Sequence, residues 1–173
     1  MQDTDILPDV LQSNLLIVFC GTAAGNASAA AREYYRHSNN KFWTVLHETG
    51  LTKEKLKSHE YAHVKEFGIG LTDLCKRHSG NDKHIRITPE DCHCLEQKIK
   101  KYRPQFLAFT SLNAGKRFCG YKSELGLQDR VIGETRIYIL PSTSPSADWN
   151  WKTTKTHWDT FAQLALLDKS NRT

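Results

Sequence analysis

The sequence predicts an α/β protein whose strands lie parallel in a sheet that helices cover on both faces. Apolar runs of strand length alternate along the chain with segments of helical spacing, the order that parallel strands require. The run at 14–20 holds six apolar residues in succession, a pattern typical of a strand buried on both faces. Loops of small or hydroxyl-bearing residues follow three runs, at 21–28, 110–116 and 141–147. Because parallel strands end at one edge of a sheet, we expect these loops to meet there.

Composition places few limits on function. The 173 residues predict a single domain over 1–173 with a core of its own. A net charge of +5 permits a polyanionic partner without requiring one. The five cysteines form no C-x-x-C pair, so we expect reduced thiols, a cytoplasmic protein and no metal or cofactor. No apolar run reaches about 18 residues and the first residues lack a basic start, so no membrane partner is expected.

The loop at 21–28 is predicted to form one wall of a ligand site. Gly21 and Gly25 enclose Ala23 and Ala24, so a ligand can approach the backbone closely. Ligands of open α/β sheets bind just beyond the carboxyl ends of the strands. A plain turn would have a similar composition, and these residues leave both interpretations open.

Residues 42–49 are predicted to form a helix with marked ends. Apolar residues from Phe42 onward recur at helical spacing, and Gly50 stands where a C-cap is expected. Asn39 or Asn40 would be the N-cap. Capping therefore competes with any catalytic role for these amides.

A second helix is expected at about 53–66. It contains His59-Glu60-Tyr61-Ala62-His63, which matches the H-E-x-x-H pattern of zinc proteases. The segment is polar, and the further ligand of one zinc-protease branch does not follow. We therefore expect a solvated face that carries two histidines.

The other elements follow from local signals. A strand is predicted at 67–75. Thr88-Pro89-Glu90-Asp91 combines a cap, a proline at the first helical position and acids in the first turn, so a helix begins there and ends near Tyr102. Further elements are expected at 105–111 (strand), 113–116 (the start of a short helix), 135–140 (strand) and 155–168 (amphipathic helix).

The loop at 141–147 is suited to phosphate groups. Two prolines stiffen it, and small hydroxyls with backbone N–H groups bind phosphate oxygens well. Tyr34 and Tyr35 could stack on a planar ligand. Together these features suggest a site for a nucleic-acid base and its flanking phosphates.

Four segments carry a resemblance to a known family: 18–25, 34–43, 68–74 and 140–147. In this order and spacing they resemble the uracil-DNA glycosylase superfamily, most closely its mismatch-specific uracil/thymine and hypoxanthine-DNA glycosylase branches. The resemblance spans 14–165. It implies a three-layer α/β/α sandwich with a central four-stranded parallel sheet. It also implies an enzyme that flips a base out of DNA and hydrolyses its N-glycosidic bond without a cofactor.

The resemblance implies a set of base-binding residues: Thr22, Ala23, Ala24, Tyr35 and Asp73. Tyr35 matches the aromatic residue that stacks on the flipped base, and the backbone of Thr22–Ala24 lines the pocket. Asp73 stands where the family often has a base-reading amide. An ionised carboxylate accepts a hydrogen bond from a base N–H but cannot donate to its carbonyl. Uracil and hypoxanthine both offer that edge, so Asp73 does not separate them, and a surface or structural Asp73 stays an alternative.

The expected catalytic residues depend on one position at which this sequence differs from the mismatch enzymes. Ala23 replaces the water-positioning Asn of the mismatch enzymes. The hypoxanthine branch also lacks that Asn, and an Asn in its Asn-x-Phe-Trp motif is implicated instead, which matches Asn40 here. We expect Asn40 to orient the water, with Asn26 and His37 as alternates, and Ser142 to occupy a catalytic position after the last strand. The expected DNA-binding residues are Ser111, Lys116, Ser142, Thr143, Ser144, Ser146 and Ala147.

The leading hypothesis is therefore a monomeric, monofunctional uracil-DNA glycosylase that acts on uracil-containing DNA in base excision repair. It would be cytoplasmic, or nucleoid-associated in a prokaryote. The alternatives are excision of hypoxanthine or of mismatched thymine or uracil, and, because of Ala23, an inactive DNA-binding homologue.

Overall fold

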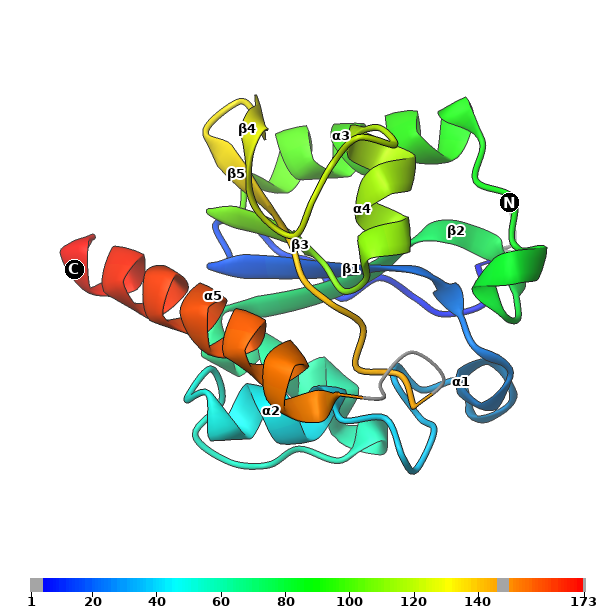
Figure 1. The fold of residues 1–173 in the computed structure, drawn as a ribbon, viewed down its shortest axis with the longest axis horizontal. Helices are drawn as coiled ribbons and strands as arrows, with labels where there is room; N and C mark the ends of the chain where they lie inside the picture. The colour runs from blue at the N-terminus through cyan, green and yellow to red at the C-terminus, as the bar shows by residue number, and fades with distance from the viewer. Residues whose placement is uncertain (1–4, 146–149, 173) are drawn as a thin grey trace.

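The fold was analysed in a computed structural model that describes residues 5–145 and 150–172. Within these ranges the chain forms a single sheet with the strand order β2-β1-β3-β5-β4 (Figure 1). The strands are β1 (Ile17–Ala24), β2 (Ile69–Ser79), β3 (Phe106–Phe109), β4 (Gly126–Ile132) and β5 (Thr135–Ile139). The helices are α1 (Asn26–Ala31), α2 (Phe42–Glu48), α3 (Pro89–Tyr102), α4 (Leu112–Cys119) and α5 (Trp151–Asn171), with 3₁₀ helices η1 (Ser58–Phe67) and η2 (Asp82–His84).

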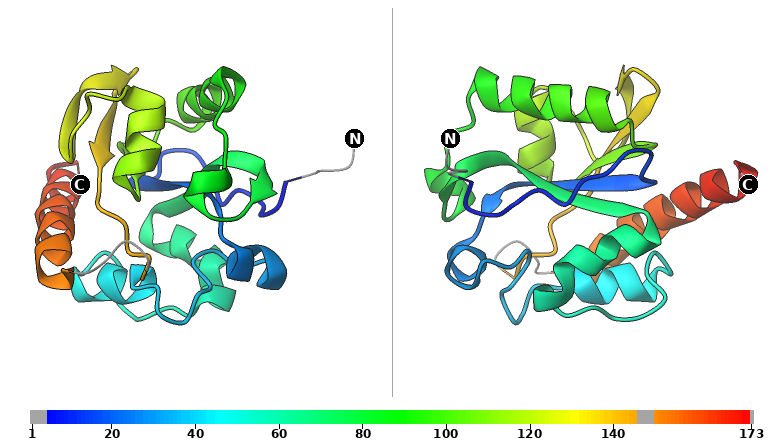
Figure 2. Two further views of the ribbon diagram at one scale, coloured as in Figure 1. Left: turned by 45° about the vertical axis from the view of Figure 1, so that its right-hand side comes forward. Right: turned by 180° about the vertical axis from the view of Figure 1, so that it is seen from behind.

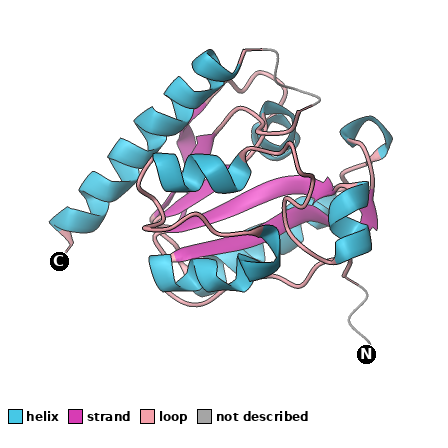
Figure 3. Cartoon of the chain, turned by 90° about the horizontal axis from the view of Figure 1, so that it is seen from below, coloured by secondary structure: helices cyan, strands magenta, loops and turns pink. Residues whose placement is uncertain are grey.

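Helices cover both faces of the sheet, which confirms the three-layer α/β/α prediction. Helices α3 and α4 lie on one face, and α2, η1 and α5 lie on the other (Figures 1 and 2). Two separate clusters of buried apolar side chains fill the two interfaces. Viewed from below, the layer that contains α2 and α5 lies in front of the strands (Figure 3). No helix in the described part of the chain is long and apolar enough to cross a membrane.

The sheet differs from the prediction in one strand. β2, β1, β3 and β5 are parallel as expected, but β4 adds a fifth, antiparallel strand beside β5. β4 occupies an edge and is largely exposed; Leu127 and Val131 each keep 51% of their surface exposed. The half-polar sequence of such an edge strand lacks the apolar run that marks the buried strands.

Two predicted elements need correction. β1 extends to Ala24, because its last residues pair with β2 (Gly21 with Asp73, Ala23 with Cys75), and α1 begins at residue 26. The expected loop at 21–28 is therefore mostly strand and helix. The expected α-helix at 53–66 is the 3₁₀ helix η1.

In a 3₁₀ helix, residues four apart do not share a face. His59 and His63 are both exposed, as predicted for a solvated stretch. No group of three potential metal ligands occurs among the described residues.

The helix starts on the α3 and α4 side agree with the sequence. Thr88 and Asp91 form a capping box at the start of α3, and the Ser111 hydroxyl accepts a hydrogen bond from Ala114 N at the start of α4. These caps satisfy backbone N–H groups that the helix itself leaves unpaired. They fix where α3 and α4 begin, and Ser111 fixes the chain directly after β3.

Gly115 lets α4 pack directly onto β5. A Cβ at Gly115 would lie 2.5–2.7 Å from three side-chain carbon atoms of Ile139. We predict that Gly115→Ala lowers the free energy of unfolding by about 1–2 kcal/mol, because overpacking outweighs the gain in helix propensity. Urea unfolding measures the difference. Gly25→Ala is the matched control, since no atom lies within 4 Å of its Cβ position; equal losses in both variants would contradict the packing argument.

Candidate functional site

Strand ends and one loop residue converge around Gly21. A Cβ at Gly21 would lie 2.6 Å from Asp73 Oδ1 and 3.6 Å from both Thr110 Oγ1 and Tyr35 Oη. Asp73 is the β2 residue paired with Gly21, and Thr110 directly follows β3. A carboxylate and two hydroxyls therefore lie around Gly21, and a side chain at this position would require Asp73 to move. This is the edge of the sheet at which the parallel order predicts a ligand site.

Asp73 is a buried carboxyl group with an altered acidity. Only 7% of the residue is exposed, which excludes a surface aspartate. Burial raises the pKa of Asp73 to about 6; Lys76 opposes the rise, whereas Asp9 and Asp82 add to it. At neutral pH the group is mostly an ionised hydrogen-bond acceptor, and a small fall in pH converts it into a donor.

Tyr35 is held in an unusual backbone conformation. Its φ is 51°, in the left-handed region that bulky residues rarely adopt. The ring stacks on Phe42 with centroids 3.8 Å apart, and the hydroxyl hydrogen-bonds to the hydroxyl of Thr110 at 3.0 Å. Burial raises the pKa of Tyr35 well above its ordinary value, so the hydroxyl stays protonated. Phe42 covers one face of the Tyr35 ring, and a base could stack only on the other.

Asn40 joins two loops of the site. Its Oδ1 accepts hydrogen bonds from Phe42 N at 2.9 Å and from Thr143 Oγ1 at 2.8 Å. The first bond satisfies the N–H of Phe42, the first residue of α2, but the N-cap is Lys41, so the prediction that Asn39 or Asn40 is the N-cap is wrong. Because the two donors identify Oδ1 as the oxygen, the Nδ2 group is the part of the amide that can donate to a water.

The other predicted catalytic residues are spread around this centre. Asn26 is the exposed first residue of α1. His37 is exposed, and its Nδ1 accepts a hydrogen bond from Asn39 N at 3.1 Å. The Ser142 hydroxyl accepts from Ser144 N at 3.1 Å within its own loop. Of the four candidates, Asn40 has the most fully fixed side chain.

The predicted DNA-binding residues differ in their burial and in their hydrogen bonds. Thr143 is 2% exposed, its hydroxyl donates to Asn40, and its carbonyl accepts from Lys41 N. Ser111 caps α4, and Lys116 lies half-buried on that helix. Ser146 and Ala147 lie outside the described residues. Contact of this set with DNA stays a prediction.

Sequence reasoning missed two polar residues of the site region, Thr110 and Asp82. The Thr22 hydroxyl and Asn113 Nδ2 both donate to Asp82 Oδ2, at 3.2 and 3.0 Å. The Thr22 hydroxyl is therefore engaged by η2, and the predicted role of Thr22 in base binding rests on its backbone. A survey of every polar residue just past a strand end would have found Thr110, but no local signal marks Asp82.

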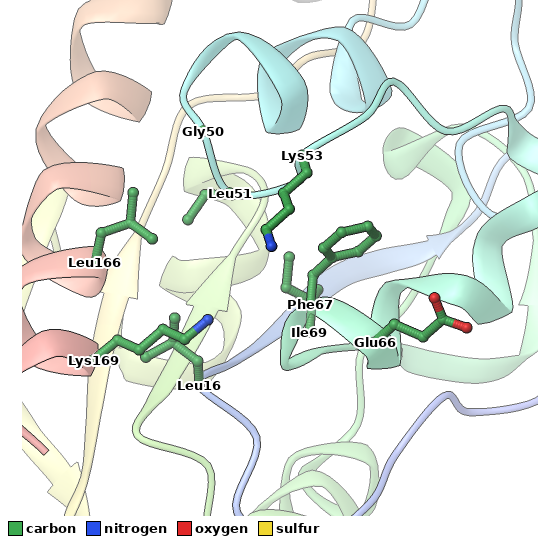
Figure 4. Close-up of a pocket in the computed structure, with 9 residues that line it drawn as sticks. All are labelled: Leu16, Gly50, Leu51, Lys53, Glu66, Phe67, Ile69, Leu166 and Lys169. Atoms are coloured by element: carbon green, nitrogen blue, oxygen red, sulfur yellow. The ribbon is translucent and has the colours of Figure 1, made fainter. Parts of the chain in front are cut away.

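A separate cavity of about 250 Å³ lies away from this site. It adjoins the first residues of β1 and β2, at the opposite end of the strands (Figure 4). Two lysines and a glutamate surround an apolar floor there; the lining residues are Leu16, Gly50, Leu51, Lys53, Glu66, Phe67, Ile69, Leu166 and Lys169. None of the predicted site residues lines it.

Comparison with known proteins decides the family. The family described as the uracil DNA glycosylase superfamily matches residues 8–165. The chain belongs to this superfamily. The solution structure of a candidate uracil DNA glycosylase from Methanosarcina acetivorans has a similar fold, with a TM-score of 0.63 at 20% sequence identity over 92% of this chain and 96% of that one. Membership of the superfamily makes the chain a DNA glycosylase by family and DNA its partner.

The raised pKa of Asp73 predicts a specific pH dependence of stability in this glycosylase. The folded state holds the proton more tightly than the unfolded state, so the free energy of unfolding falls as pH rises from about 4 to about 6. Asp73→Asn removes this loss. We expect it to stabilise the protein by about 2 kcal/mol at pH 8 and to have little effect at pH 4.

Thermal unfolding at both pH values measures this effect. Asp129→Asn, on the exposed edge strand β4, is the control and should change stability by less than about 0.5 kcal/mol at either pH. An Asp73→Asn variant that is less stable than the wild type at pH 8 would contradict the buried-carboxylate account.

Proposed function

We propose that this superfamily member is a monofunctional glycosylase that flips uracil out of DNA and hydrolyses its N-glycosidic bond, leaving an abasic site. The observation that carries the proposal is the buried Asp73 carboxylate beside Gly21, with the hydroxyls of Tyr35 and Thr110 at the same place. A buried carboxylate whose pKa is raised by burial is unfavourable for folding alone. Such groups occur where a ligand needs them.

Recognition of the base would use the polar edge of uracil. The ionised Asp73 accepts the N3–H, and the Tyr35 and Thr110 hydroxyls, with the backbone of 22–24, are available as donors to a flanking carbonyl. A site built to pair with an N–H discriminates strongly against a base that lacks it. Gly21 contributes space, because a side chain there would displace the Asp73 carboxylate from its present place.

Water activation would fall to Asn40. Ala23 has no polar side-chain atom, so the amide function of the mismatch enzymes cannot come from that position. Asn40 is held from both sides by Phe42 N and Thr143. A polar group fixed before the reaction can orient a water without reorganisation, which lowers the barrier.

Hypoxanthine is the second candidate base. It presents the same N–H and carbonyl edge, and the likeness of Asn40-Lys41-Phe42-Trp43 to the motif of the hypoxanthine branch favours it. The chemistry of Asp73 suits both bases. The two functions therefore differ only in the substrate excised.

Oligonucleotides that carry one uracil, one hypoxanthine or one G·T mismatch test the proposal, with alkali cleaving the abasic product. We expect cleavage at uracil, unaffected by EDTA, because the described residues form no cluster of three metal ligands. Cleavage only at hypoxanthine would replace the first function by the second. Intact strands on all three substrates would show an inactive DNA-binding homologue.

Asn40→Ala tests the assignment of the water. We predict a loss of about 100-fold in single-turnover excision, equivalent to about 3 kcal/mol in the barrier. Asn39→Ala is the matched control, because Asn39 is the neighbouring exposed amide and its rate should stay within about threefold of wild type. Circular dichroism checks that α2 survives the loss of the hydrogen bond from Phe42 N to Asn40. A folded Asn40→Ala enzyme with the wild-type rate would remove Asn40 from the mechanism.

A further inference from the structure

The segment at residues 6–10 covers the outer edge of the sheet. It runs antiparallel to β2, with Ile6 N donating to Lys76 O at 2.8 Å and Val10 exchanging two backbone hydrogen bonds of 2.9 Å with Leu71 (Figure 2). Asp9 lies between these anchoring points. The backbone pairing therefore fixes Asp9 beside the middle of β2, the strand that carries Asp73.

The carboxylate of Asp9 collects donors from two layers of the protein. Lys76 Nζ lies 2.7 Å from Oδ1 and Lys98 Nζ, from α3, lies 2.6 Å from Oδ2; Thr72 Oγ1 donates to Oδ1 at 2.6 Å. We call these four residues the Asp9 cluster. Burial disfavours a charged Asp9, but the attraction and hydrogen bonds of its partners outweigh burial and lower its pKa. The cluster thus holds one carboxylate and two ammonium groups.

Lys76 connects the Asp9 cluster to the aromatic part of the site. Its Nζ donates to Tyr34 Oη at 3.2 Å, and Tyr34 Oη donates to Pro8 O at 2.9 Å. Tyr34 is 2% exposed and directly precedes Tyr35, the residue with the left-handed backbone. One bond joins Tyr34 to Pro8 of the N-terminal segment, and the other joins it to Lys76, which pairs with that segment. They fix the chain immediately before the strained residue of the site.

The Asp9 cluster also acts electrostatically on Asp73, which directly follows Thr72 of the cluster on β2. Lys76 and Lys98 favour the ionised form of Asp73, whereas Asp9 and, from η2, Asp82 oppose it. The neighbouring side chains of Tyr34, Tyr35 and Cys20 stay neutral, because burial raises the pKa of each. The balance between two ammonium groups and two carboxylates therefore acts on the group proposed to read the base.

We propose that the Asp9 cluster is a positioning element of the base site: through Tyr34 it holds Tyr35, and through its charge balance it sets whether Asp73 presents an acceptor or a donor to the base. The proposal rests on the proposed function of Asp73. Removal of the Asp9 charge leaves the positive charges of Lys76 and Lys98 without this carboxylate and favours the ionised form of Asp73. Removal of the Lys76 charge leaves Lys98 as the only cation paired with Asp9 among the described residues and favours the protonated form of Asp73.

Two variants of the full chain, Asp9→Asn and Lys76→Gln, test this inference. The probe is single-turnover excision from the uracil oligonucleotide between pH 4.5 and pH 8, at about half-unit steps. We expect an inflection near pH 6 for the wild type, which moves down by about one pH unit in Asp9→Asn and up by about one unit in Lys76→Gln. Lys76→Arg should restore the wild-type inflection. Lys98→Gln, which removes the more exposed ammonium, should move it upward like Lys76→Gln.

The controls use an equivalent ion-pair group on α3. Glu96 pairs with two cations, Lys100 at 2.8 Å and Arg130 at 3.2 Å, and is not among the groups that shift Asp73. Glu96→Gln and Lys100→Gln make the same charge changes and should leave the inflection in place. Equal shifts in the control and cluster variants would show only a general effect of net charge and would overturn the inference.

Titration of Asp73 by carboxyl ¹³C NMR, without DNA, separates this inference from the proposed function. Opposite movements of the Asp73 titration in the two folded variants would support the cluster's electrostatic role even if no substrate were excised, in which case only the proposed function fails. An Asp73 titration that stays fixed, or moves in the same direction in both variants, overturns the inference even if uracil excision is observed.

Discussion

The pairing of Asp73 with a glycine, Gly21, on the neighbouring strand is the constraint on which the rest of the site depends. A buried carboxylate is unfavourable by several kcal/mol unless donors or cations compensate for it. Here the parallel pairing of β1 with β2 puts Asp73 opposite a glycine, and a Cβ in that place would lie 2.6 Å from Oδ1. Edge strand β2 thus provides the charge of this site, and its neighbour β1 provides the space and the backbone.

The groups around this contact come from distant parts of the chain. Tyr35 reaches Thr110 across 75 residues, Asn40 reaches Thr143 across 103, and Asp9 reaches Thr72 across 63. Each link fastens a loop to a strand or to the segment that follows one. The strained backbone of Tyr35 persists because Phe42, Thr110 and Tyr34 hold it from several directions.

The sequence predicted the features of the fold that depend on neighbouring residues in the chain. The α/β layers, the capping box of Thr88 and the buried run of β1 follow from periodicity and capping, and the family resemblance pointed to Tyr35 and Asp73 before their surroundings were known. Edge strand β4, the 3₁₀ geometry of η1 and the strand pairing of Gly21–Ala24 depend on tertiary contacts. So do the capture of Thr22 by Asp82 and the Asp9 cluster, which no sequence spacing marks.

The central claim is that the Asp73 carboxylate accepts the N–H of the flipped base. The most direct test changes the substrate: single-turnover excision at pH 7.5 of uracil and of 3-methyluracil, in which a methyl group replaces the N3 hydrogen, from otherwise identical oligonucleotides. We predict that 3-methyluracil is excised at least about 100-fold more slowly, because it leaves Asp73 buried without the N3–H donor. Excision of both bases at the same rate would contradict the account.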